Sequence, residues 1–138
     1  MSRAERALAL LMRAEAVMVL CAVPAVVMPT AWMDAIHRGL GMGELPRSPL
    51  VEYLTRSLSM MYAGWGPLLF VLAADLRRYL PLVTLVWWLT AVFGVALWML
   101  DLAVGMPPAW TWTEGPFVVG VGVVGLLLVR QVGRERRP

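Results

Sequence analysis

Five polar residues carry most of the chemistry available to this sequence: His37, Glu52, Arg56, Asp101 and Glu114. A histidine titrates near neutral pH, and carboxylates and an arginine bind charged or hydrogen-bonding groups. Together they could form a polar pocket for a lipid headgroup, a quinone-like ligand or a small solute. They could equally form a structural ion-pair network, in which Arg56 pairs with one of the three acids and fixes the helix ends. The sequence leaves both interpretations open.

Glu15 is a further candidate, because it interrupts an apolar segment near the N-terminus. An acid inside a membrane span commonly serves ion or proton transfer. The alternative is a structural ion pair at the inner boundary with one of three arginines, Arg77, Arg78 or Arg130. Both hypotheses stay open at this point.

The counts of cysteine and histidine exclude several kinds of site. A single cysteine, Cys21, excludes an intramolecular disulfide, a CxxC redox centre and a cysteine zinc site. A single histidine excludes haem held by two histidines of one chain. Because no nucleophile–base pair or metal-binding motif is evident, we expect no catalytic residue, no bound metal and no cofactor. Enzymatic activity on a lipid or quinone remains an open, less favoured alternative.

Gly120, Gly122 and Gly125 match the spacing GxGxxG, which binds a dinucleotide when it stands in a βαβ unit. Here the glycines lie inside a valine-rich apolar segment. The spacing therefore predicts close packing of two helices instead.

These residues must be positioned by membrane-spanning helices. The chain has 138 residues, of which 60% are hydrophobic and 15% charged, whereas soluble domains average about 45–50% apolar and about 25% charged residues. A small soluble domain could not bury so much apolar surface, and a membrane span needs about 20 mostly apolar residues. Four segments meet this requirement, at about 7–28, 57–74, 80–104 and 115–129. The sequence predicts an all-α fold, an integral membrane four-helix bundle that forms a single domain over residues 1–138.

The long connection between the first two spans predicts a short helix at about 31–40, capped by Thr30. Asp34 and Arg38 are spaced for an i, i+4 ion pair, as are Glu52 and Arg56. The apolar residues of the short helix share one face, as in a helix that lies in the plane of the membrane interface. They are Trp32, Met33, Ile36 and Leu40.

Helix boundaries follow from capping residues and prolines. Ser48 and Pro49 predict the start of the second helix, outside the membrane, and Pro81 predicts the start of the third. Thr113 suits the start of the fourth helix. Pro24 should kink the first span.

The arginines indicate the orientation of the chain. They concentrate near the N-terminus, between the second and third spans and at the C-terminus, and these regions share one side of a four-span protein. Cytoplasmic segments carry the excess of basic residues, so both termini are predicted to be cytoplasmic. The formal charge is only +3 and lies mainly at the chain ends, so we expect no nucleic-acid binding. Four tryptophans fall near the outer boundary, where indole rings are enriched: Trp32, Trp98, Trp110 and Trp112.

Several motifs together resemble those of a known group of proteins. They are Pro29, Arg56, the segment 74–81 with the sequence ADLRRYLP, Asp101 followed by Gly105-Met106-Pro107, and Glu114-Gly115-Pro116. With them, most of the chain resembles small bacterial four-span proteins of the DoxX-like and DUF4345 type. The resemblance implies a four-helix bundle in the bacterial inner (cytoplasmic) membrane and implies no particular activity.

Two functions are expected from these features. The first is a structural, accessory or partner-binding membrane subunit, which contacts the lipid bilayer and either another membrane protein or further copies of itself. The alternative is a protein that binds or transports a small solute, a lipid or a quinone through the outer polar cluster.

Overall fold

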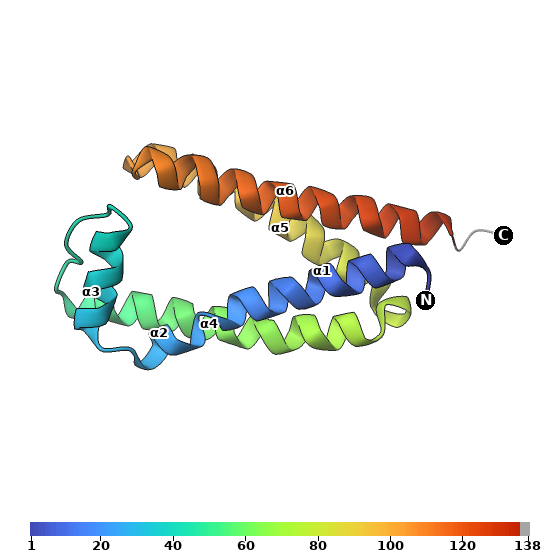
Figure 1. The fold of residues 1–138 in the computed structure, drawn as a ribbon, viewed down its shortest axis with the longest axis horizontal. Helices are drawn as coiled ribbons and strands as arrows, with labels where there is room; N and C mark the ends of the chain where they lie inside the picture. Colours follow the sequence, from blue (N-terminus) through green and yellow to red (C-terminus); the bar gives the residue numbers. More distant parts are fainter. Residues whose placement is uncertain (136–138) are drawn as a thin grey trace. The chain divides into compact units, whose positions relative to one another are not determined.

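The computed structural model describes residues 1–135, and within them every regular element is a helix (Figure 1). The helices are α1 (Arg3–Leu20), α2 (Val23–Val27), α3 (Thr30–Gly39), α4 (Pro49–Ala74), α5 (Leu76–Val104) and α6 (Pro108–Arg134). Four helical segments are long and apolar enough to cross a membrane: Arg3–Val27, which combines α1 and α2, and the helices α4, α5 and α6. The predicted all-α fold with four apolar helices is confirmed, and it is consistent with a multi-pass membrane protein.

The contacts divide the chain into two compact units. The first unit comprises Met1–Met12 and the chain from Val71 onward, and it contains the antiparallel pair α5 and α6. The second unit is Arg13–Phe70, with the rest of α1, the short helices α2 and α3, and most of α4. The expected organisation as a single domain stays a prediction.

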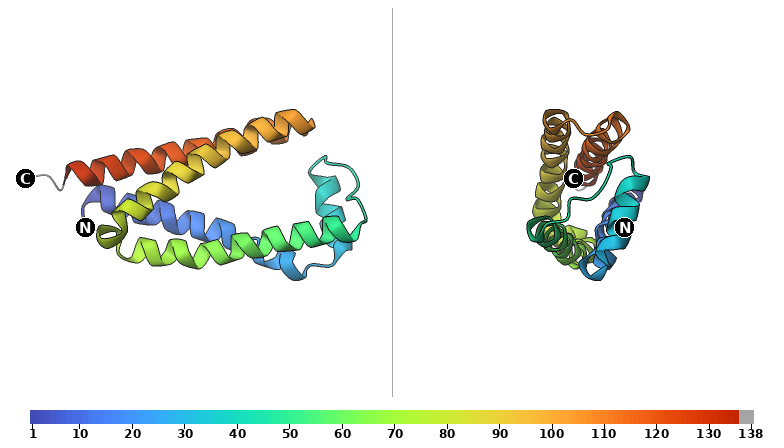
Figure 2. Two further views of the ribbon diagram at one scale, coloured as in Figure 1. Left: turned by 180° about the vertical axis from the view of Figure 1, so that it is seen from behind. Right: turned by 90° about the vertical axis from the view of Figure 1, so that its left-hand side faces the viewer.

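α5 and α6 lie side by side (Figure 2), and glycines allow the two helices to pack closely. A β-carbon on Gly122 would lie 2.6 Å from the backbone nitrogen of Ala91, and one on Gly125 would collide with the indole of Trp87. The two backbones therefore approach more closely than larger residues would permit. The prediction that these glycines pack helices is confirmed for Gly122 and Gly125. A β-carbon on Gly120, in contrast, would meet nothing within 4 Å.

The core of the first unit is built from the start of α1, the start of α5 and the end of α6. Trp87 is its largest fully buried side chain and lies against Gly125, so the glycine leaves the volume that the indole fills. Such packing is a main source of helix association in lipid, because burial from water no longer drives it there. The fully buried large side chains of this unit are Leu8, Met12, Val83, Trp87 and Val132.

α5 begins earlier than predicted, because Asp75 caps it. The Asp75 carboxylate accepts a hydrogen bond from the backbone nitrogen of Arg78 at 3.1 Å. This bond satisfies one of the backbone donors that the first turn of a helix leaves free. The helix therefore starts at Leu76, and Pro81 lies inside it. The prediction that Pro81 starts this helix is wrong.

α6 also begins earlier than predicted, at Pro108 rather than near Thr113. Pro107 is extended, with φ −51° and ψ 136°, and Pro108 takes a position in the first turn, where its missing N–H costs little. Thr113 caps no helix, because its hydroxyl donates to the carbonyl oxygen of Ala109 at 2.7 Å. The paired prolines, and not Thr113, set the start of this helix.

In the second unit, the first apolar segment is broken rather than simply kinked near Pro24. α1 ends at Leu20, and α2 starts at Val23 with Pro24 in its first turn. The last part of α1 packs on α4 at Gly66, where a β-carbon would lie 2.5 Å from Cγ of Leu20.

The predicted start of α3 is wrong, whereas the predicted start of α4 is confirmed. Thr30 is the first residue of α3, not its cap, and Pro29 before it makes no side-chain capping bond. The hydroxyl oxygen of Ser48 accepts a hydrogen bond from the backbone nitrogen of Val51 at 3.1 Å. α4 accordingly starts at Pro49, as the sequence predicted.

Replacing Gly125 with alanine should destabilise the α5–α6 pair, because the new methyl group collides with the Trp87 indole. Overpacking of this kind costs about 1–3 kcal/mol. This cost equals or exceeds the gain of about 1 kcal/mol from the higher helix propensity of alanine. Gly120→Ala is the matched control, because its methyl group meets nothing. Thermal unfolding in detergent should give a lower midpoint for Gly125→Ala than for Gly120→Ala, and equal midpoints would contradict the packing described.

Candidate functional site

Arg56, near the start of α4, joins neighbouring segments of the second unit. Its Nη1 donates to the carbonyl oxygen of Val26 at 2.6 Å, and its Nη2 donates to that of Met28 at 3.1 Å. Its Nε and Nη2 also donate to Oε1 of Glu52, at 3.2 Å and 2.9 Å. The last carbonyls of a helix have no partner within that helix. Arg56 therefore completes the end of α2 from a neighbouring helix.

Glu52 forms the i, i+4 ion pair with Arg56 that the sequence predicted. Its Oε1 also accepts a hydrogen bond from the hydroxyl of Thr30, the first residue of α3, at 3.3 Å. Two charged side chains and one hydroxyl thereby connect the end of α2, the start of α3 and the start of α4. In the second unit these polar residues therefore join neighbouring helix ends.

Asp34 fastens the segment 40–48 to α3. Its Oδ2 accepts hydrogen bonds from Arg38, the predicted i, i+4 partner, and its Oδ1 accepts one from the backbone nitrogen of Leu45 at 2.8 Å. These bonds, that from Arg38 first, stabilise the carboxylate and hold the pKa of Asp34 below its usual value. His37 acts on the same segment, because its Nδ1 lies 3.0 Å from the carbonyl oxygen of Gly43.

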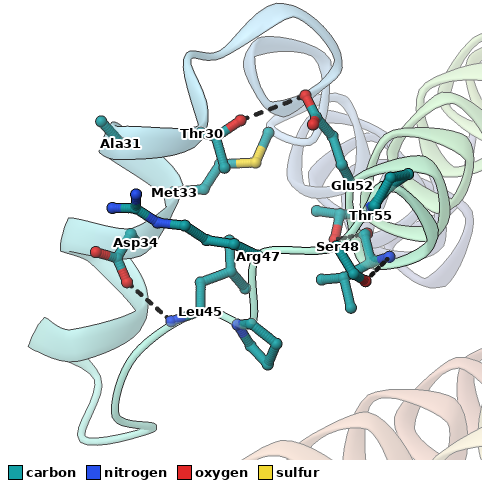
Figure 3. A pocket seen from close by; sticks show the side chains of 12 residues that line it. Thr30, Ala31, Met33, Asp34, Leu45, Arg47, Ser48, Glu52 and Thr55 are labelled. Carbon is teal, nitrogen blue, oxygen red and sulfur yellow. Dashed lines mark hydrogen bonds between the residues drawn. The ribbon is translucent and has the colours of Figure 1, made fainter.

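A cavity of about 470 Å³ opens between α3, residues 45–48 and the start of α4 (Figure 3). Its charged lining residues are Asp34, Glu52 and the exposed Arg47. Asp34 already accepts hydrogen bonds from Arg38, and Glu52 from Arg56. The cavity is open and has a mixed, mainly apolar lining, and its two carboxylates are already paired with arginines.

Asp101 and Glu114 lie in the first unit, at the end where α5 connects to α6. Asp101 is only 5% exposed, and its Oδ2 has no hydrogen-bond partner among the described residues. Glu114 accepts a hydrogen bond from the indole nitrogen of Trp110, and it lies within electrostatic reach of Asp101. A pocket of about 130 Å³ is lined by Asp101 and Trp112, whose ring meets that of Trp98 edge-on at 5.3 Å. This end of the hairpin brings two predicted residues together.

The five residues of the predicted polar cluster are thus distributed over both units. Glu52 and Arg56 pair in the second unit, where His37 contacts its own loop, while Asp101 and Glu114 belong to the first. Within residues 1–135, no three histidine, cysteine, aspartate or glutamate side chains are grouped so that they could hold a metal ion.

Glu15, the remaining candidate, is half-buried on α1 in the second unit. Of the three arginines suggested for it, Arg77 forms a two-bond ion pair with Glu5 in the first unit. Arg77 Nε donates to Glu5 Oε1 at 2.9 Å, and Nη2 donates to Oε2 at 3.1 Å. The role of Glu15 stays a prediction.

Glu5 was not among the predicted residues, although a local signal for it exists. The backbone nitrogen of Glu5 donates to the hydroxyl oxygen of Ser2 at 3.1 Å. In return, the backbone nitrogen of Ser2 donates to Oε2 of Glu5 at 3.0 Å. This is a capping box, which the S-x-x-E spacing predicts. The pair with Arg77 spans 72 residues and depends on the fold.

Removing the guanidinium of Arg56 should loosen the connection between α2, α3 and α4. Arg56→Gln leaves the Val26 and Met28 carbonyls without their donors, and each unsatisfied buried group costs about 1–3 kcal/mol. Limited proteolysis in detergent should cut residues 21–48 faster in Arg56→Gln than in the native protein. Arg47→Gln, which removes an exposed guanidinium from the same segment, is the control and should match the native protein. Equal rates for all three proteins would contradict this role of Arg56.

Asp34 should make the 40–48 segment sensitive to acid. Because folding lowers its pKa, the stabilisation is complete above the unfolded value, near 3.9, and is lost as pH falls through the lower folded value. Hydrogen exchange at the Leu45 amide should remain slow at pH 5 and lose protection in stronger acid. The Val51 amide, bonded to the non-titrating Ser48 hydroxyl, is the internal control. Asp34→Asn should abolish the acid transition, and an unchanged transition would exclude Asp34 as its origin.

The chain was compared with known families, curated proteins and solved structures. No family model, no curated protein and no solved structure matches it. The resemblance to DoxX-like and DUF4345 proteins therefore stays a prediction, and the function is argued from the geometry alone.

Proposed function

We propose that the protein is a non-catalytic, multi-pass subunit of the bacterial inner membrane that packs against a helix of another chain. The observation that carries this proposal is the outward position of Gly120. Its neighbours Gly122 and Gly125 are covered by α5, but a β-carbon on Gly120 would meet nothing within 4 Å. A glycine inside a helix costs about 1 kcal/mol relative to alanine. In membranes such small residues are enriched where two helices meet.

The surroundings of Gly120 support this use. Large apolar side chains on the same helix remain about half exposed on either side of it, and they would provide contact area for a partner helix. They include Phe117 at 58%, Val124 at 48% and Leu127 at 50% exposure. The partner is a second copy of the chain or a different membrane protein.

We place α3 in the plane of the outer interface and both termini in the cytoplasm. Trp32 and Ile36 of α3 are exposed, at 64% and 52%, as is its C-cap Leu40 at 49%, whereas Met33 is buried. Asp34 and Arg38 are instead paired with each other. An amphipathic helix of this kind lies with its apolar face in the boundary between headgroups and acyl chains.

A second candidate function, binding of a small ligand at the outer end of α5 and α6, is favoured by one observation. The buried Oδ2 of Asp101 lacks a hydrogen-bond partner among the described residues, and Asp101 lines a small pocket. Buried polar groups normally have partners. An orphaned carboxylate beside a pocket therefore favours a ligand or ordered water there.

Gly120→Leu should disrupt assembly without unfolding the chain. The bulky side chain prevents close approach of a partner helix, while the packing against α5 is untouched. Gly133→Leu is the matched control, because Gly133 lies on the same helix, also with open space around it, but near its C-terminal end.

Chemical cross-linking in native membranes, followed by native mass spectrometry from mild detergent, should show an assembly for the native protein and Gly133→Leu. Its yield should fall at least tenfold in Gly120→Leu. Energy transfer between labelled copies in vesicles would identify self-association, and a co-purifying second chain would identify a different partner. A native protein that is strictly monomeric in both experiments would refute the proposal.

A further inference from the structure

We propose that the pocket at the connected end of α5 and α6 binds an ammonium group, carried either by a small organic amine or by a phospholipid headgroup. Asp101 provides the negative charge, and Trp112 provides an aromatic wall. The inference rests on the second candidate function above and names its ligand class.

The first step is the unfulfilled bonding capacity of Asp101. The residue is 5% exposed, its Oδ2 is buried, and no described residue donates a hydrogen bond to that atom. The pocket of about 130 Å³ lies directly beside it. A buried charge is stable only when it is paired and hydrogen-bonded, so a cation in this pocket would stabilise the ionised carboxylate of Asp101.

Neither α5 nor α6 carries an arginine close to Asp101 or Glu114. The nearest arginine before Asp101 on α5 is Arg78, 23 residues away, which is about 35 Å along a helix at 1.5 Å per residue. From Glu114 the nearest arginine on α6 is Arg130, 16 residues away, or about 24 Å. Glu114 does not line the pocket but lies within electrostatic reach of Asp101, so no arginine of this hairpin compensates the charge beside the pocket.

Thr111 is the other polar residue that lines the pocket. Its hydroxyl is directed to the carbonyl oxygens of Met106 and Pro107, each at 3.3 Å. The hydroxyl proton is thus used within the hairpin, so Thr111 offers a ligand no hydrogen-bond donor, and Asp101 is the charged residue of the lining. A site of acceptors and negative charge selects a cation and rejects phosphate or carboxylate.

The rest of the lining favours an organic ammonium group over a metal ion. Carbon-rich residues dominate the rest of the lining, including Leu102, Met106 and Pro108. Trp112 is held by its edge-on contact with Trp98 at 5.3 Å, and an indole face attracts an ammonium group. The volume is well below the roughly 300–1,000 Å³ of pockets for drug-sized ligands. A headgroup-sized ammonium therefore fits better than a larger ligand.

The direct test uses the purified full-length protein in detergent, titrated with tetramethylammonium chloride against a sodium chloride reference. Isothermal titration calorimetry should show saturable binding that weakens at least tenfold in Asp101→Asn and in Trp112→Leu. The matched controls are Asp75→Asn, which keeps an N-cap side chain, and Trp32→Leu, which removes an equally exposed tryptophan from the second unit. Both controls should bind like the native protein. Absence of saturable binding, or binding that the Asp101 and Trp112 variants leave unchanged, would overturn the proposal.

A second arm identifies the source of the ammonium group. Nanodiscs with phosphatidylethanolamine are compared with nanodiscs of phosphatidylglycerol alone, and lipid retention is read by native mass spectrometry. Retention of phosphatidylethanolamine that requires Asp101 supports a lipid headgroup, whereas tetramethylammonium binding without such retention supports a free amine.

A third arm separates the ligand class from the binding function itself. The same titrations are made with inorganic phosphate and with a short-chain ubiquinone. Binding of either probe that requires Asp101, without tetramethylammonium binding, would retain a ligand site but refute the ammonium class. No binding of any probe, in detergent or in nanodiscs, would leave the Asp101 pocket filled by water only and refute both.

Discussion

A bilayer offers almost no hydrogen bonds to charge, so each charged group near its core needs a partner from the protein or a position at the water boundary. With the proposed insertion in a membrane, this constraint accounts for several of the observed ion pairs. Glu5 pairs with Arg77, Glu52 pairs with Arg56, and Asp34 accepts hydrogen bonds from Arg38 and from the loop after α3. Each pairing also determines a local structure, because it closes a helix end or fastens a loop. Asp101 stands apart, since its buried oxygen lacks such a partner among the described residues.

Local signals in the sequence predicted two ion pairs and one helix start whose partners lie within one helical turn. The spacing of Asp34 and Arg38, and of Glu52 and Arg56, predicted both ion pairs, and Ser48 predicted the start of α4. Predictions failed where two local signals competed. Asp75 caps α5 before Pro81 can begin it, and the prolines at 107 and 108 start α6 before Thr113.

Contacts between distant segments could not be predicted from spacing. The pair of Glu5 with Arg77 spans 72 residues, and the carbonyls that Arg56 binds lie 28 and 30 residues before it. The pocket beside Asp101 also depends on the register of α5 against α6, which the glycines fix by allowing Trp98 to lie against Gly115. The sequence identified Asp101 as a candidate from its residue type. Its unsatisfied oxygen and the adjacent Trp112 are seen only in the structure.

In the proposed orientation, the four spans place both chain ends in the cytoplasm and the Asp101 pocket outside. The most direct test is cysteine accessibility in intact cells, after Cys21 is replaced by serine. Single cysteines at Glu44 and Met106 should react with a membrane-impermeant maleimide from outside, whereas one at Glu135 should react only after permeabilisation. Labelling of all three positions from the same side would contradict the account.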